Sequence, residues 1–272
     1  MTLFRSSLVS VALALLWAAV FVALRPASHA SLSQAGDIDP LLDRIAERAK
    51  SYQEVKNWRA TTLTVATEMD KNWKPKKTTR IKKTVTVTES GRSEKVLEAL
   101  QTEKGSTKDI TAEYNREAEE RRRTAQGQPA EKSPGNDDKK DEENRMSRSL
   151  GLGEILPFSE KEREGFTFAR RPDEELDGRT VLVLESKAKI KDEKFWEGLY
   201  FIDPESDTLL SVRLTISKNP KFVKELSTEI DFQVLPDGHF FVKKTRMKIN
   251  AGMVIKHIRM VIEEDYSDIE IF

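Results

Sequence analysis

Residues 195–217 read FWEGLYFIDPESDTLLSVRLTIS, and this stretch decides the fold. An apolar segment at 195–202 is followed at 203–207 by Asp, Pro, Glu and Ser, residues that are typical of a tight turn. The next segment, 208–217, alternates between apolar and polar residues, as a half-buried strand does. One face of this strand carries four branched apolar residues: Leu210, Val212, Leu214 and Ile216. Two strands joined by a short turn predict an antiparallel pair.

The same pattern continues on both sides of this pair. The alternation predicts strands at 166–170, 179–186, 226–235, 239–250 and 253–265. Turn residues separate them at Asp177-Gly178, at Pro236-Asp237-Gly238 and at Ala251-Gly252. About six strands at this spacing, with no helix between them, predict an antiparallel meander that suits a barrel or a sandwich.

The N-terminal half combines one helix with more strands. Residues 37–58 predict an amphipathic helix, because apolar residues recur at helical spacing. These residues are Leu41, Leu42, Ile45, Ala49, Tyr52 and Val55. Alternation then predicts strands at 59–70 and 78–90, with a turn at 71–77 between them and a continuation at 94–100.

A polar segment separates the two halves. Residues 111–123 favour a helix by propensity, but this helix would be polar on all sides. Residues 124–145 have dense charge and no apolar periodicity, so we expect a disordered insertion. The alternative is a segment that docks to a partner protein.

The first thirty residues predict export. Arg5 precedes an apolar run at 8–24, and Ser28-His29-Ala30 places small residues where a signal peptidase cleaves. We therefore expect residues 1–30 to be a signal peptide and the protein to reside in the periplasm. The alternative is an uncleaved anchor in the inner membrane, because the run is close to the shortest that spans a bilayer.

Composition excludes several classes of protein. The 272 residues contain 46 basic and 46 acidic side chains, and this neutrality argues against a nucleic-acid partner. The absence of cysteine excludes a lipid-modified cysteine, a cysteine nucleophile and cysteine-held metal clusters.

The search for catalytic residues finds no motif. The three histidines, His29, His239 and His257, show no metal-ligand spacing, and there is no nucleophile elbow or phosphate-binding loop. The glycine pair of Gly151-Leu152-Gly153 lacks the third glycine and the lysine of a phosphate site. We therefore expect no enzyme activity, no cofactor and no metal.

The amino-acid sequence of several predicted strands and turns resembles that of a known family. The relevant segments are 166–168 (FTF), 175–179 (ELDGR), 181–184 (VLVL), 195–203 (FWEGLYFID), 210–213 (LSVR), 220–225 (PKFVKE) and 265–268 (DYSD). They resemble bacterial outer-membrane lipoprotein-sorting proteins of the LolA-like superfamily. The resemblance implies a mainly β (α+β) fold, in which a curved antiparallel sheet forms an incomplete, half-open β-barrel covered by an N-terminal helix and loops. It also implies a single domain at 31–272 that contains the polar insertion.

A half-barrel with one apolar face can bind lipid without catalytic groups. If the helix covers that face incompletely, acyl chains can fill the remaining cavity, and each buried CH₂ contributes about 0.8 kcal/mol. The candidate cavity residues are Leu63, Val65, Val85, Val87, Leu182, Leu184, Leu210, Val212, Leu214, Ile216, Ile230 and Phe232. The alternative is that these residues form a closed core, because periodicity reports burial rather than voids.

Two functions follow from these observations. The first is a periplasmic carrier that shields lipid or lipoprotein acyl chains and contacts the membrane only transiently, unless the leader is retained. The alternative is an envelope sensor or interaction module that uses the same half-barrel to bind a partner protein.

Overall fold

The computed structural model describes residues 38–53, 55, 57–89, 91–116, 119, 156–252 and 257–272. Residues 37–272 form one compact unit. The predicted signal peptide, the predicted insertion at 124–145 and the glycine pair at 151–153 all lie outside the described residues. The structure therefore does not test those predictions.

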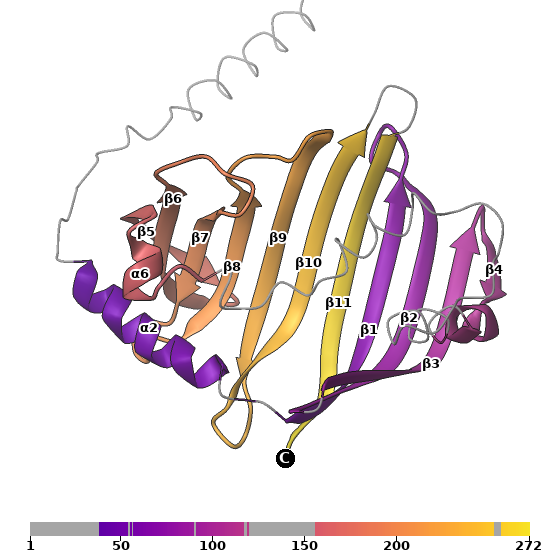
Figure 1. Ribbon diagram of the computed structural model, residues 1–272, viewed down its shortest axis with the longest axis horizontal. Helices are drawn as coiled ribbons and strands as arrows, with labels where there is room; N and C mark the ends of the chain where they lie inside the picture. The colour runs from indigo at the N-terminus through magenta and orange to yellow at the C-terminus, as the bar shows by residue number, and fades with distance from the viewer. Residues whose placement is uncertain are drawn as a thin grey trace, which may run out of the picture. The chain divides into compact units, whose positions relative to one another are not determined.

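In the described part of the chain, eleven strands form one sheet in which every neighbouring pair is antiparallel (Figure 1). The strands are β1 (Trp58–Met69), β2 (Pro75–Thr88), β3 (Gly91–Glu103), β4 (Ser106–Asp109), β5 (Phe166–Leu176), β6 (Arg179–Ala188), β7 (Trp196–Ile202), β8 (Leu209–Ile216), β9 (Val223–Val234), β10 (Phe240–Gly252) and β11 (His257–Ile271). Their order is β4-β3-β2-β1-β11-β10-β9-β8-β7-β6-β5, so β4 and β5 are the end strands. The predicted fold class is confirmed: the sheet is long, antiparallel and not closed into a barrel.

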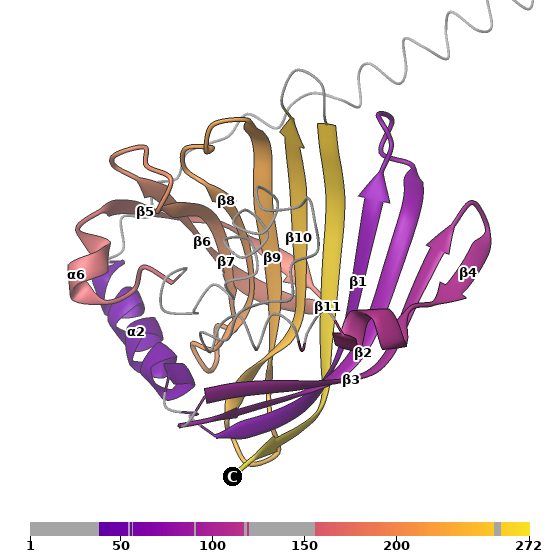
Figure 2. The ribbon, with the colours of Figure 1, turned by 45° about the vertical axis from the view of Figure 1, so that its right-hand side comes forward.

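The first and last strands of the domain pair with each other. β1 lies between β2 and β11, and its register runs from the Trp58–Ile271 pair to the Glu68–Met260 pair. This pairing joins the meander β1–β4 to the meander β5–β11 in one continuous sheet, which Figure 2 shows curving along its length.

Two labelled helices, α2 (Asp39–Gln53) and α6 (Glu160–Arg163), accompany the sheet in the described residues, and residues 111–116 of the segment predicted to favour a helix are also helical. α2 has an acidic residue, Asp39, in its first turn, and the short α6 is capped by Ser159. α2 buries Leu42 and Ile45 against the sheet, and we call the side of the sheet that it contacts the α2 face.

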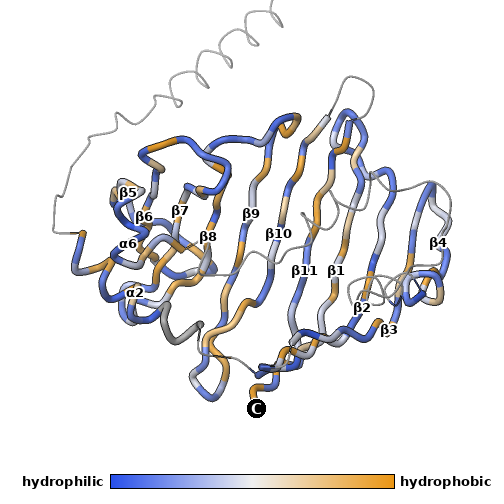
Figure 3. The backbone as a smooth tube through the Cα atoms, in the orientation of Figure 1, coloured by the Kyte–Doolittle hydropathy of each residue, from blue (hydrophilic) through white to orange (hydrophobic). Residues whose placement is uncertain are grey.

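The sheet has an apolar cluster on each side. Hydropathy alternates along the strands because successive side chains point to opposite faces (Figure 3). On the α2 face, the buried members of the apolar cluster are Leu42, Ile45, Leu156, Phe158, Leu184, Trp196, Tyr200, Ile202, Leu209, Val212, Leu214, Ile230, Phe232 and Phe240. The smaller cluster on the opposite face is formed by Val181, Val183 and Phe201.

Several element boundaries differ from the prediction. The helix ends at Gln53 rather than near Trp58, because Trp58 enters β1 and packs its ring against Phe241 at 5.0 Å. Pro75 begins β2 instead of lying in the preceding turn, and the short strand β4 was not predicted.

The predicted turn at Ala251-Gly252 is wrong. Both residues belong to β10 and pair with Ile258 and His257 of β11. The described part of the last strand therefore begins at His257, and it continues to Ile271, beyond the predicted end at residue 265.

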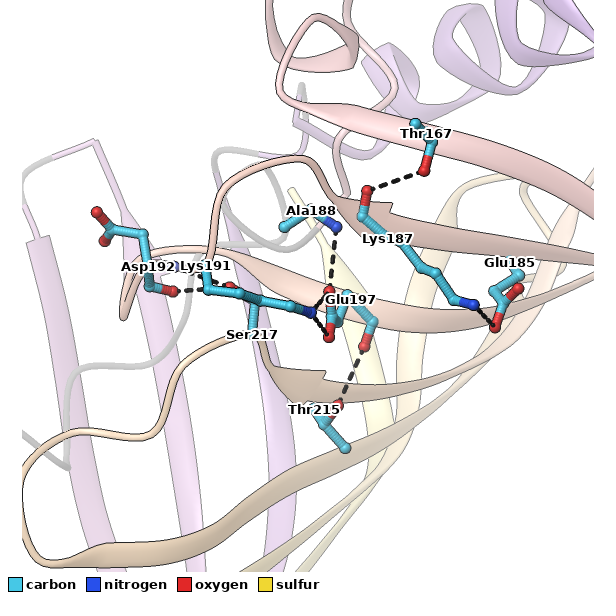
Figure 4. Close-up of polar contacts among 9 residues, drawn as sticks. All are labelled: Thr167, Glu185, Lys187, Ala188, Lys191, Asp192, Glu197, Thr215 and Ser217. Carbon is cyan, nitrogen blue, oxygen red and sulfur yellow. Dashed lines mark hydrogen bonds and ion pairs between the residues drawn. The ribbon is translucent and has the colours of Figure 1, made fainter.

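The connection between β6 and β7 is fastened by side-chain hydrogen bonds (Figure 4). The Glu197 carboxylate accepts from the Ala188 backbone N–H at 3.1 Å and from the Lys191 ammonium at 2.5 Å. The Ser217 hydroxyl donates to the Asp192 carbonyl at 2.9 Å. These contacts hold the connection against β7 and β8, next to the buried Trp196.

We predict that Gly198→Ala disrupts the β7–β8 pairing. Gly198 has a φ of 155°, and an added Cβ would lie 2.1 Å from the carbonyl oxygen of Arg213, which belongs to the neighbouring strand. Because this contact is with backbone, we expect a loss of about 3 kcal/mol in the free energy of unfolding, measured by urea denaturation. Gly165→Ala is the control, since the nearest backbone atom to its Cβ would be at 3.4 Å. Equal stability of the two variants would contradict the prediction.

Candidate functional site

Six of the twelve predicted cavity residues come together on the α2 face. They belong to the apolar cluster or pack against it: Leu182, Leu184, Val212, Leu214, Ile230 and Phe232. The strands β6, β7, β8 and β9 position them, because their opposed residues point to the same side of the sheet.

Three further predicted residues share this face but lie outside the cluster. Ile216 is opposite Trp196, which belongs to the cluster. Val85 and Val87 are opposite Ala60 and Trp58, at the other end of the sheet.

The other three residues require a correction. Leu63 and Val65 lie on the opposite face, because their neighbour Thr64 occupies the α2 face in register with Glu264. The buried face of this part of β1 carries the small residues Ala60 and Thr62 instead.

Leu210 also lies on the opposite face, where it packs against the Val181, Val183 and Phe201 cluster. A β-bulge in the β7–β8 pairing, between Phe201 and Ile202, changes the alternation there. Leu209 consequently enters the apolar cluster of the α2 face in place of Leu210.

The apolar cluster is packed beneath α2. Val212 and Leu214 are 0% and 1% exposed, and Leu42 and Ile45 from the helix belong to the same cluster. Phe158, from the segment before α6, adds an edge-to-face contact with Tyr200, at 4.8 Å between ring centroids. In this structure α2 and Phe158 therefore occupy the position that the prediction assigned to a ligand.

The α2 face changes character across the sheet. One row of opposed residues crosses eight strands, from β6 to β2: Leu184, Tyr200, Val212, Ile230, Thr245, Glu264, Thr64 and Ile81. The row is mainly apolar from β6 to β9 and polar from β10 to β1. The same face thus has an apolar region beneath α2 and a polar region beside it.

A network of charged and hydroxyl side chains forms the polar region. The Lys83 ammonium lies 3.1 Å from the Glu94 carboxylate and 3.9 Å from that of Glu264. Glu264 accepts hydrogen bonds from the hydroxyl of Thr64 at 3.1 Å and from that of Tyr266 at 2.9 Å. We call the following seven residues the polar cluster: Thr62, Thr64, Lys83, Arg92, Glu94, Glu264 and Tyr266.

Burial and charge shift the pKa values of two groups in this cluster. Burial tends to raise the pKa of Glu94, but its ion pairs with Lys83 and Arg92 outweigh burial and lower it. Burial, together with the neighbouring Glu264 carboxylate, raises the pKa of the Tyr266 hydroxyl. The cluster therefore holds Glu94 ionised and Tyr266 protonated at neutral pH.

No pattern in the sequence predicts the polar cluster. Thr64 and Glu264 are 200 residues apart in the chain, and no local motif indicates that they meet. A bulge between Lys82 and Lys83 in the β2–β3 pairing also changes the alternation beside Lys83.

The opposite face carries alternating charges and a shallow hollow. Lys248 pairs with Glu225 at 2.8 Å, and its ammonium lies 4.4 Å above the ring of Trp73. The hollow has a volume of about 430 Å³, and its lining residues are Met69, Trp73, Ser227, Glu229, Arg246, Lys248 and Val261.

Two further properties concern the described residues alone. His239 pairs with Asp237, His257 begins β11, and nowhere in this part of the chain do three acidic or histidine side chains lie together as a metal site requires. No helix of the described ranges has both the length and the hydropathy needed to cross a membrane.

Comparison with known proteins gives similarity at the level of structure. No protein-family model matches the sequence, and no curated protein matches it. The structure is similar to an outer membrane lipoprotein-sorting protein domain from Vibrio parahaemolyticus, with 11% identity, 85% of this chain and 91% of that chain covered, and a TM-score of 0.35. It is also similar to a LolA superfamily protein from Nitrosomonas europaea, with 11% identity, 85% of this chain and 93% of that chain covered, and a TM-score of 0.35. A third similar structure is a DUF1329 family protein from Desulfovibrio piger, with 9% identity, 86% of this chain and 92% of that chain covered, and a TM-score of 0.36.

At these identities and TM-scores the function has to be argued from the residues of this chain.

We predict that Glu94→Gln changes the dependence of stability on pH. The pKa of Glu94 is lower in the folded state than the ordinary value of about 4.3. Its ionised form therefore stabilises the fold above that value, and this contribution is lost as the pH falls through the folded pKa. We expect the variant to be less stable by roughly 1 kcal/mol at pH 7 and the difference to shrink by about pH 3, in urea denaturation.

The control is Glu229→Gln, which removes an exposed carboxylate on the opposite face, 4.0 Å from Arg246. A difference between Glu94→Gln and the unmodified protein that stays constant or grows towards low pH would contradict the prediction.

Proposed function

We propose that this protein is an exported carrier that binds lipid or lipoprotein acyl chains against the apolar cluster of its α2 face. The observation that carries the proposal is that one helix covers this cluster mainly through apolar contacts. An acyl chain offers the same kind of contact, so it can take the place of the helix.

The contacts of α2 are of two kinds. Leu42 and Ile45 are 2% and 1% exposed in the cluster, with Ile38, Leu41 and Ala46 packed around them. The polar contacts are two ion pairs at 2.6 Å: Arg44 pairs with Asp207 of the β7–β8 connection, and Asp43 pairs with Arg163 of α6. Arg44 and Asp43 are largely exposed, and ion pairs of this kind contribute little to stability because water screens them.

The free energies favour replacement of the helix by a long acyl chain. Burial of Leu42 and Ile45 contributes about 1.5–3 kcal/mol for each side chain. A chain of about 15 methylene groups contributes roughly 12 kcal/mol when it is fully buried. An acyl chain buried along its length therefore gains more free energy than Leu42 and Ile45 together, before the cost of ordering it is counted.

The location follows from the predicted signal peptide at residues 1–30. We propose the periplasm as the site of action, with transient contact to the membrane and to envelope lipoproteins as the source of acyl chains. No catalytic step is part of this function.

The alternative, an interaction module for a partner protein, rests on the polar insertion at 124–145. That segment lies outside the described residues, so this alternative stays a prediction of the sequence. Deletion of residues 124–144 tests it, because only the interaction module requires them for capture of a partner.

We predict that fastening α2 to the sheet abolishes lipid binding. The chain has no cysteine, so Arg44→Cys and Asp207→Cys together create a unique pair for a short bismaleimide tether across the observed ion pair. We expect the tethered protein to lose at least about tenfold of its affinity for a fluorescent fatty-acyl probe, because α2 can no longer leave the cluster. The same double-cysteine variant, with each cysteine blocked separately by N-ethylmaleimide so that no tether forms, should bind the probe as the unmodified protein does.

The control tether joins Lys248→Cys to Glu225→Cys, an ion pair at 2.8 Å on the opposite face. Equal binding by the two tethered proteins would contradict displacement of α2. This test is preferable to a charge at Leu214, because that side chain is 1% exposed and a charge there would unfold the core.

A further inference from the structure

The polar cluster lies on the same face as the apolar cluster, at a distance that one lipid can span. Glu264 on β11 and Ile230 on β9 are both opposed to Thr245 on the intervening strand β10. Neighbouring strands are about 4.8 Å apart, so two spacings separate Glu264 from the edge of the apolar cluster by roughly 10 Å.

One buried hydroxyl of the polar cluster lacks a partner. The Thr62 side chain is fully buried, and its Oγ1 makes no hydrogen bond to the protein. The register places Thr62 between Lys83 on β2 and Tyr266 on β11, on the α2 face. Because buried hydroxyls in folded proteins are nearly always hydrogen-bonded, the cluster has an unused donor for a ligand oxygen, which can reach it only when the side chains that bury Thr62 move aside.

The charges of the polar cluster balance. Lys83 and Arg92 contribute two positive charges, and Glu94 and Glu264 contribute two negative charges. Arg92 contacts Glu94 at 2.7 Å, whereas Glu264 is 3.9 Å from its nearest cation, Lys83. The positive charge is thus centred near Glu94, and Glu264 is the carboxylate with the looser ion pair.

This arrangement matches a head group that carries both signs. An anionic head group would meet Glu94 and Glu264 without a compensating charge of its own. A zwitterion presents an anion to Lys83 and a cation to Glu264, so both of its charges are paired after they leave water.

We propose that the polar cluster binds the head group of a zwitterionic phospholipid of the phosphoethanolamine class, while the acyl chains lie on the apolar cluster. The phosphate accepts hydrogen bonds from the Thr62 hydroxyl and the Lys83 ammonium, and the ligand ammonium faces Glu264. This inference rests on the proposed function, since it names the lipid that the same face binds.

The experiment compares head groups on identical tails by isothermal titration of the purified protein. The probes are dihexanoyl phosphatidylethanolamine, dihexanoyl phosphatidylglycerol and a neutral fatty-acyl ester that has no charged head group. We expect the ethanolamine lipid to bind about tenfold more tightly than the glycerol lipid. Glu264→Gln should remove this preference, because Glu264 faces the ammonium that only the ethanolamine lipid has. Thr62→Val should weaken both phospholipids alike, because they share the phosphate. Both variants should leave binding of the neutral ester unchanged.

The matched control is Glu263→Gln, which alters the neighbouring residue of β11 on the opposite face, beside Lys244 and Arg246. It should retain the preference for the ethanolamine lipid.

Three results would overturn the inference, and they are distinguishable. The first is equal or tighter binding of the glycerol lipid, and the second is an equal effect of Glu264→Gln and Glu263→Gln. Either result would contradict the head-group site, while binding of the ester would still support a carrier. Failure of all three probes to bind would overturn the proposed function itself.

Discussion

The pairing of β1 with β11 holds the two halves of the sheet together. It joins residues 58–69 to residues 257–271 and thereby converts two separate meanders into one sheet. Without it, the polar cluster would be divided between two sheets: its members on β11 would stay with the apolar cluster of β6–β9, and its members on β1, β2 and β3 would not. With it, both clusters occupy one face, and a single row of opposed residues runs from Leu184 to Ile81.

Local patterns in the sequence predict the strands well, because alternation and turn residues act over a few positions. The segment around Val212 and Leu214 shows this, since its strand, its turn and its buried face were all predicted. The errors arise where distant pairing decides the outcome. The bulge beside Ile202 moves Leu210 to the other face, and the pairing with β11 leaves small residues such as Ala60 on the buried side of β1 in place of Leu63. The polar cluster could not be predicted, because its contacts join residues up to 200 positions apart.

The sequence left open whether the predicted residues surround a cavity or form a closed core. In the structure the core is packed, and a helix held by apolar contacts and exposed ion pairs completes it. Under the proposed function, α2 and the acyl chain are competing occupants of one surface. The difference between their contact free energies then sets how readily the carrier loads. The polar cluster adds a means of selection to this proposal, because it lies on the same face beside the apolar cluster.

Native mass spectrometry of the protein purified from the envelope of an expressing bacterium tests the central claim most directly, because it weighs the chain together with whatever it has bound. A carrier should show a bound species with the mass of a lipid, which organic extraction removes and added lipid restores. A bare polypeptide that also fails to take up added lipid would contradict the account, because the apolar face would then belong to a permanently closed core.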